Sequence, residues 1–166
     1  IVDYGRGNLF SLEHAFAHCG AQVRVSGLAR DVEEASALVL PGVGAFGDAM
    51  CALAERGLVA PLRAAAERGT PLLGICLGMQ LLFDGSEEFG THEGLGLIPG
   101  VVRRLPDGAM RIPNVGWRSL ARRRPDSLLD GAAEDAMYYF VHSFAAEPTT
   151  REHTVATLRF NGAEPA

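Results

Sequence analysis

The sequence predicts an α/β fold, an open, mostly parallel twisted sheet flanked by helices, with a strand-rich second half. Short β-branched or Leu-rich runs alternate with longer amphipathic runs, which is the pattern of strands joined by helical crossovers. After Gly90 the pattern changes to short strands separated by Gly and Pro turns. A chain of 166 residues is typical of one domain, so we expect residues 1–166 to form a single domain.

The predicted elements follow in chain order. Residues 1–3 look like the stub of a strand, and Asn8 can cap a helix that runs through about Cys19. Further strands are expected at 22–25, 37–40 and 71–75, with an acidic helical turn at 31–35, an Ala-rich helix over 48–68 interrupted near Gly57 and Pro61, and a short helix over 77–83. The second half has predicted strands at 101–105, 117–120, 138–144 and 154–158.

Composition and charge exclude several classes of function. The 15 cationic residues, all arginine, against 20 acidic ones leave a net charge of 15 − 20 = −5, which argues against nucleic-acid binding. No apolar run approaches the roughly 18 residues that a membrane helix needs, and no secretory signal opens the chain, so we expect a cytoplasmic protein. The three cysteines form no CxxC pair, which predicts neither disulfide nor metal site.

Cys76 is the candidate nucleophile. It lies at the centre of G-I-C-L-G, residues 74–78, between a predicted strand and a predicted helix. This is the form of a nucleophile elbow, a sharp turn that presents the side chain at a helix N-terminus, where the macrodipole favours a thiolate. The alternative is a buried structural cysteine, which is how we interpret Cys19 and Cys51 on predicted apolar helix faces. At Cys76 the two flanking glycines favour catalysis.

A second glycine-rich turn supplies a candidate oxyanion site. The strand ending at Leu40 is followed by P-G-V-G, residues 41–44, whose glycines allow backbone N–H groups to face a ligand. Ligands of open α/β sheets bind at this carboxyl end of the strands. Alone the motif is compatible with an ordinary turn, whereas together with Cys76 it indicates an acyl-transfer site.

These motifs resemble those of a known family. P-G-V-G-A-F-G-D at 41–48 with G-I-C-L-G-M-Q at 74–80 resembles the class I, triad-type glutamine amidotransferases, whose fold is flavodoxin-like. The resemblance narrows to the glutaminase subunits of imidazole glycerol phosphate synthase through Y-G-R-G-N at 4–8, G-L-G-L-I-P-G at 94–100, V-G-W at 115–117 and Y-Y-F-V-H-S at 138–143. It extends over essentially all 166 residues.

The resemblance implies a function in histidine biosynthesis. Glutamine would be hydrolysed through a Cys76 thioester to glutamate and ammonia. The ammonia would pass to a cyclase partner, a (β/α)8 barrel in a heterodimer, which makes imidazole glycerol phosphate and aminoimidazole carboxamide ribotide. The family implies no cofactor, no metal, no nucleic acid and no membrane.

The resemblance also assigns residues, position by position. The implied oxyanion residues are Val43, Gly44 and Leu77; the implied glutamine-binding residues are Gln80, Glu88, His142, Ser143 and Phe144; and the implied partner contacts are Asn8, Ser11, Trp117 and Tyr139. Without it, Gln80 is also compatible with ordinary helix solvation, Glu88 with surface charge, and Trp117 and Tyr139 with core packing.

The sequence departs from the family in three places. The family's catalytic base lies in a His-Pro-Glu motif, and none of the five histidines in these 166 residues is followed by Pro-Glu. We therefore expect a sequence incomplete at both ends, whose parent gene supplies the missing His and Glu, and little glutaminase activity from residues 1–166 alone. His14 and His18, spaced i, i+4, are expected to be solvated rather than metal ligands. Asn114 and Arg118 stand where the family usually has His and Asn, which leaves the details of the partner contact open.

Two other functions remain compatible with the sequence. The chain could serve another class I synthase, such as that of anthranilate or pyridoxal phosphate, or it could be a non-catalytic pseudo-amidotransferase scaffold, for which the absent His-x-Glu is the only support. Ammonia transfer to a purified cyclase, and labelling of Cys76 by an electrophilic glutamine analogue, would discriminate.

Overall fold

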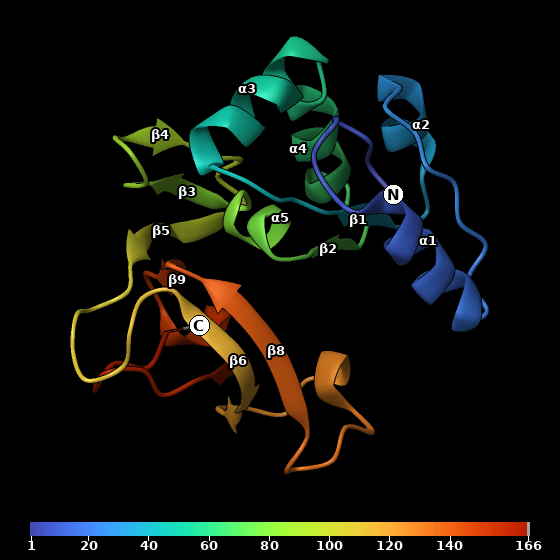
Figure 1. Ribbon diagram of the computed structural model, residues 1–166. Helices are drawn as coiled ribbons and strands as arrows, with labels where there is room; N and C mark the ends of the chain where they lie inside the picture. The colour runs from blue at the N-terminus through green and yellow to red at the C-terminus, as the bar shows by residue number, and fades with distance from the viewer. Residues whose placement is uncertain (166) are drawn as a thin grey trace. The chain divides into compact units, whose positions relative to one another are not determined.

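The computed structural model describes residues 1–165 of the chain (Figure 1). The chain divides into two compact units, Ile1–Leu97 and Ile98–Ala166, and each is described by itself. The single domain expected from the sequence stays a prediction, which the cooperativity of unfolding would test. Within residues 1–165, no helix is long and apolar enough to cross a membrane.

The first unit is built on parallel strands. β1 (Leu38–Leu40) pairs in parallel with β2 (Leu72–Gly74), the Val2 amide donates to the Val39 carbonyl at 2.9 Å, and Val2 forms a parallel bridge with Ser26. The four segments therefore lie side by side in the order Ser26, Val2, β1, β2, which is the second, first, third and fourth along the chain. This is the beginning of the flavodoxin-like strand order, and it confirms the predicted fold class.

Five helices accompany these strands in the described part of the first unit. They are α1 (Leu9–His18), α2 (Ala29–Glu34), α3 (Phe46–Glu55), α4 (Val59–Glu67) and α5 (Leu77–Gln80), and an antiparallel hairpin of β3 (Phe83–Ser86) and β4 (His92–Glu93) completes the unit. Asn8 caps α1 as predicted, its Oδ1 accepting from the Ser11 amide at 3.2 Å. Pro61 lies in the first turn of α4, where no amide donor is required, so it does not interrupt the helix.

Four predictions for this unit need correction. The helix expected over 77–83 ends at Gln80, and Phe83 begins β3. The strand expected at 22–25 is reduced to the isolated bridge at Ser26, and β2 is half-buried rather than buried. Cys19 and Cys51 are exposed and are not packing residues. The buried stripe of α3 is formed by Phe46, Ala49 and Leu53 at helical spacing, and Cys51 lies off that stripe.

The second unit is made of short strands, as the pattern after Gly90 predicts, and the structure pairs them antiparallel. β5 (Ile98–Arg104) pairs with β9 (Phe144–Pro148), β6 (Asn114–Ser119) with β8 (Met137–His142), and β7 (Ala121–Arg122) with β10 (Ala156–Thr157). The strand expected over 138–144 is two strands, because β8 ends at His142 and β9 begins at Phe144. The core of the second unit holds Leu105, Ala145, Leu158 and Phe160, with Met110, Ile112 and Phe140 packed against them.

Candidate active site

Cys76 occupies a strained backbone turn. Its φ of 56° and ψ of −121° place a non-glycine residue in the left-handed half of conformational space, immediately before α5. Such a conformation costs on the order of 1–3 kcal/mol and persists only where the surrounding structure enforces it. The thiol is exposed. The sharp turn expected of a nucleophile elbow is therefore present, with its side chain accessible to a substrate.

The glycines on either side of Cys76 are required by close backbone contacts. A Cβ on Gly74 would lie 2.5 Å from Met79 Cα, and a Cβ on Gly78 would overlap the Leu40 carbonyl oxygen. The Ile75 amide donates to that same Leu40 oxygen at 3.0 Å. The elbow is thus packed directly against the end of β1, from which the 41–44 loop departs.

The 41–44 loop is held at its base and open at its tip. A Cβ on Gly42 would lie 2.7 Å from the Gly78 nitrogen and 2.8 Å from Tyr4 Oη, so the loop passes tightly between Tyr4 and α5. Tyr4 is buried, and its hydroxyl donates to the Pro41 carbonyl at 2.8 Å. Burial, supplemented by the nearby Cys76 and opposed by Arg6, raises the pKa of Tyr4 to about 12, so this hydroxyl stays a donor.

Three backbone amides near the elbow are available to a ligand. Val43 is 53% exposed and Gly44 has a φ of 98°. Among residues 1–165, the amides of Val43, Gly44 and Leu77 donate to no backbone acceptor. Because Gly42 contacts Leu77 and Gly78, the structure brings the loop and the elbow together. An oxyanion formed at Cys76 requires donors of this kind.

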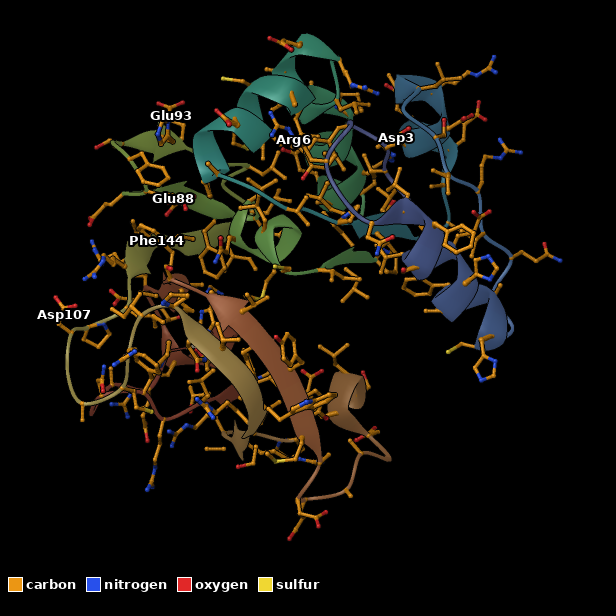
Figure 2. The ribbon with its side chains drawn as sticks, in the orientation of Figure 1. Asp3, Arg6, Glu88, Glu93, Asp107 and Phe144 are labelled. Carbon is orange, nitrogen blue, oxygen red and sulfur yellow. The ribbon has the colours of Figure 1, made fainter. Side chains whose placement is uncertain are left out.

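Glu88 connects the β3–β4 hairpin to the end of the 41–44 loop. Its carboxylate accepts a hydrogen bond from the Phe46 amide at 2.7 Å, at the first residue of α3, and its own amide donates to the buried Ser86 hydroxyl at 3.1 Å. Figure 2 shows Glu88 on the hairpin beside the start of α3. The side chain is half-buried, which excludes simple surface charge. Gln80, also half-buried, lies one turn after Cys76, and its backbone N–H donates to the Cys76 carbonyl at 3.3 Å.

His142 belongs to a hydrogen-bonded network in the second unit. Its Nε2 lies 2.8 Å from Asn114 Nδ2, its Nδ1 lies 3.0 Å from the Phe144 carbonyl oxygen, and Asn114 Oδ1 accepts from Arg118 Nε at 3.2 Å. Burial lowers the pKa of His142, and the bond to Phe144 opposes this in part. His142, Ser143 and Phe144 are all half-buried (Phe144 is labelled in Figure 2).

One face of the β6–β8 pair is apolar and exposed. Trp117 and Tyr139 stand directly opposite each other, 61% and 56% exposed, with ring centroids 5.6 Å apart in an edge-to-face arrangement. The neighbours on this face are also exposed apolar residues, and together we call this the ribbon face: Val115, Trp117, Met137, Tyr139 and Val141. Packing in the core is therefore excluded for Trp117 and Tyr139, and an apolar surface of this kind is typical of a docking site.

The remaining predicted residues lie on α1. Asn8 and Ser11 are both exposed at the start of that helix, where Asn8 serves as its cap. His14 and His18 are exposed as expected. In the part of the chain that the structure describes, no group of three or more His, Cys, Asp or Glu side chains could hold a metal ion.

Sequence reasoning missed three contacts: Tyr4 beneath the loop, Glu88 on the Phe46 amide, and Asn114 on His142. Tyr4 follows directly on the strand at residues 1–3, which is a signal that it lies near the sheet. For Glu88 and Asn114 no local pattern is available, because their partners are 42 and 28 residues distant along the chain.

Residues 1–164 match the model of the family described as glutamine amidotransferase class-I. A relative from Moorella thermoacetica, "imidazole glycerol phosphate synthase subunit HisH", is 46% identical over 160 residues, 96% of this chain and 76% of that protein. The subunit HisH of Geobacillus kaustophilus is 46% identical over 171 residues, 100% of this chain and 81% of that protein. A crystal structure of a glutamine amidotransferase superimposes with a TM-score of 0.72 at 18% identity, covering 96% of this chain and 78% of the other.

Proposed function

Because this chain belongs to the glutamine amidotransferase class-I family, we propose that it is the glutaminase subunit of an imidazole glycerol phosphate synthase. It hydrolyses glutamine to glutamate and ammonia and delivers the ammonia to a cyclase partner in histidine biosynthesis. The observation that carries the proposal is the turn at Cys76, whose φ of 56° presents an exposed thiol beside the loop at 41–44. The named relatives, 46% identical, support the choice of synthase.

The chemistry follows from the elbow and the loop. The Cys76 sulfur attacks the side-chain amide carbon of glutamine, so a C–S bond forms and the carbonyl oxygen becomes an oxyanion. The amides of Val43, Gly44 and Leu77 are the donors proposed to stabilise that charge. The C–N bond then breaks, and the nitrogen leaves as ammonia with the proton that the Cys76 thiol gave up before its attack. Water then hydrolyses the thioester, its hydroxyl going to glutamate and its proton restoring the free thiol.

Glutamine is held by residues that the family resemblance assigns. Glu88 carries the negative charge that suits the α-ammonium group of glutamine, and Gln80 follows Cys76 by one helical turn. His142, Ser143 and Phe144 are assigned to the same substrate. The Glu88 carboxylate already accepts from the Phe46 amide, and its second oxygen is the atom proposed to bind the substrate ammonium.

The ribbon face is the proposed docking surface for the cyclase, a (β/α)8 barrel. Trp117 and Tyr139 form an edge-to-face pair with more than half of each side chain exposed, and aromatic residues are enriched among those that dominate interface energetics. Asn8 and Ser11 are proposed as further contacts of the heterodimer. We assign the complex to the cytoplasm, since phosphorylated sugar intermediates do not cross membranes unaided.

The test of this function uses a full chain that carries a His-Pro-Glu motif, because residues 1–166 alone are expected to show little glutaminase activity. It measures glutamate and ammonia release by that full chain mixed with a purified cyclase barrel and its substrate. Release is expected in the wild type, together with formation of imidazole glycerol phosphate from glutamine. Cys76→Ala should abolish both. Cys51→Ala is the matched control, since Cys51 is also exposed but lies on α3, and it should leave both unchanged.

Two results would contradict the proposal. One is glutaminase activity that survives Cys76→Ala. The other is ammonia transfer to an anthranilate or pyridoxal phosphate synthase in preference to the cyclase.

A further inference from the structure

The inference concerns Asn114, a buried polar residue that begins β6 and stands directly opposite His142 on β8. Only 1% of its surface is exposed, so its amide must be satisfied within the protein. Its Nδ2 lies 2.8 Å from His142 Nε2, and its Oδ1 accepts from Arg118 Nε at 3.2 Å. Both polar atoms of the side chain are therefore engaged.

The direction of every proton in this network follows from the chemistry of its two ends. Arg118 Nε can only donate, so Asn114 presents its oxygen to Arg118 and its NH2 group to His142. The Phe144 carbonyl can only accept, so the ring proton of His142 is on Nδ1. Nε2 then carries the lone pair that accepts from Asn114. The donors run one way, from Arg118 through Asn114 and His142 to Phe144, and His142 is neutral.

The network fixes the chain on both sides of Ser143. His142 ends β8 and Phe144 begins β9, and the His142 ring ties the two strands together through the Phe144 carbonyl. A protonated ring would present a second donor on Nε2 toward the Asn114 NH2 group, and the two donors would repel. The shape of this junction therefore depends on the tautomer that Asn114 selects.

We propose that Asn114 is a positioning residue, oriented by Arg118, that holds His142 as the neutral Nδ1–H tautomer and so sets the 142–144 junction for glutamine binding. This inference rests on the proposed function, because glutamine binding is assigned to that junction there. Arg118 also donates to the Trp117 carbonyl at 3.3 Å, so the same network begins at a residue of the ribbon face.

The test uses Asn114→Asp, which keeps the shape of the side chain but replaces the donor to Nε2 with an acceptor. A carboxylate at this position favours a proton on Nε2 as well, so His142 should become an imidazolium. In the full chain bound to the cyclase, ¹⁵N chemical shifts of the His142 ring should change from the neutral Nδ1–H pattern to the doubly protonated one at pH 7. The KM for glutamine should rise about tenfold while kcat changes less than about threefold.

Thr149→Ala is the matched control, because Thr149 is exposed just after β9, outside the network and off the ribbon face, and should leave both readouts unchanged. Arg118→Met removes the outer donor without placing a charge in the interior, and it should raise the KM in the same direction by a smaller factor. This second variant keeps the test decisive if Asn114→Asp fails to fold.

The inference is overturned if, in Asn114→Asp, the His142 ring keeps its neutral ¹⁵N pattern and the enzyme keeps its wild-type KM for glutamine, or if kcat alone falls. It is also overturned if the wild-type ring is doubly protonated at pH 7. Failure of the proposed function looks different, since the wild type and Thr149→Ala would then release no ammonia, while the ring shifts would still report the tautomer.

Discussion

Replacing Gly78 with alanine sets two effects of opposite sign against each other. Gly78 lies in α5, and alanine in place of glycine in a helix is normally stabilising by about 1 kcal/mol. The new Cβ, however, would overlap the Leu40 carbonyl oxygen and lie 2.7 Å from the Leu40 carbonyl carbon and 2.9 Å from that of Pro41. All three are backbone atoms, so no side-chain rotation relieves the overlap.

The magnitude follows from these contacts. Overpacking costs about 1–3 kcal/mol, and the upper end applies where backbone must move. After the helix gain is subtracted, Gly78→Ala should lower the free energy of unfolding by about 2 kcal/mol. It should also reduce glutaminase activity, since the loop at 41–44 departs from the displaced segment.

Urea unfolding followed by circular dichroism measures the stability effect, with Gly57→Ala as the control. Gly57 has a φ of 66° and no atom within 4 Å of the added Cβ, so its substitution costs only the left-handed conformation, about 1 kcal/mol. A Gly78→Ala protein as stable as the wild type, or more stable, would refute the close packing of the elbow against β1.

Three further predictions concern other parts of the structure. Glu88→Ala should lower the free energy of unfolding by about 1–2 kcal/mol, because it leaves the Phe46 amide unpaired. Glu88→Gln should lower it by less than half of that, because the side-chain amide oxygen of glutamine still accepts from Phe46. Equal losses for the two variants in urea titrations would contradict the Glu88–Phe46 contact. Trp117→Ala should weaken cyclase binding at least about tenfold in calorimetric titrations and change stability by no more than about 0.5 kcal/mol, and undiminished binding would remove the ribbon face as the docking surface. Burial lowers the pKa of His142 in the folded protein, so as the pH falls the unfolded chain binds the proton first. The free energy of unfolding should therefore fall as the pH drops from the ordinary histidine pKa of about 6.5 toward the lowered pKa of the folded state. His142→Asn should flatten that dependence in urea titrations at pH 7.5 and 5.5, and an unchanged slope would contradict the assignment.

Local chemistry explains which features were predictable. The elbow and the 41–44 loop could be predicted because glycine positions, strand ends and helix starts are encoded within a few neighbouring residues. The exposure of Cys51 was missed because α3 is Ala-rich and its apolar face is ambiguous until Phe46, Ala49 and Leu53 are seen to be buried. The roles of Glu88 and Asn114 could not be predicted, because each depends on a partner brought near only by the tertiary fold.

The central claim, that Cys76 is the glutamine-directed nucleophile, is tested most directly by covalent labelling. The full chain bound to the cyclase is treated with a diazoketone analogue of glutamine and mapped by peptide mass spectrometry. Cys19, Cys51 and Cys76 are all exposed, so accessibility alone would label all three. We predict one adduct, on Cys76, that excess glutamine prevents. Labelling of Cys19 or Cys51 at a comparable rate, or labelling of Cys76 that glutamine does not slow, would contradict the claim.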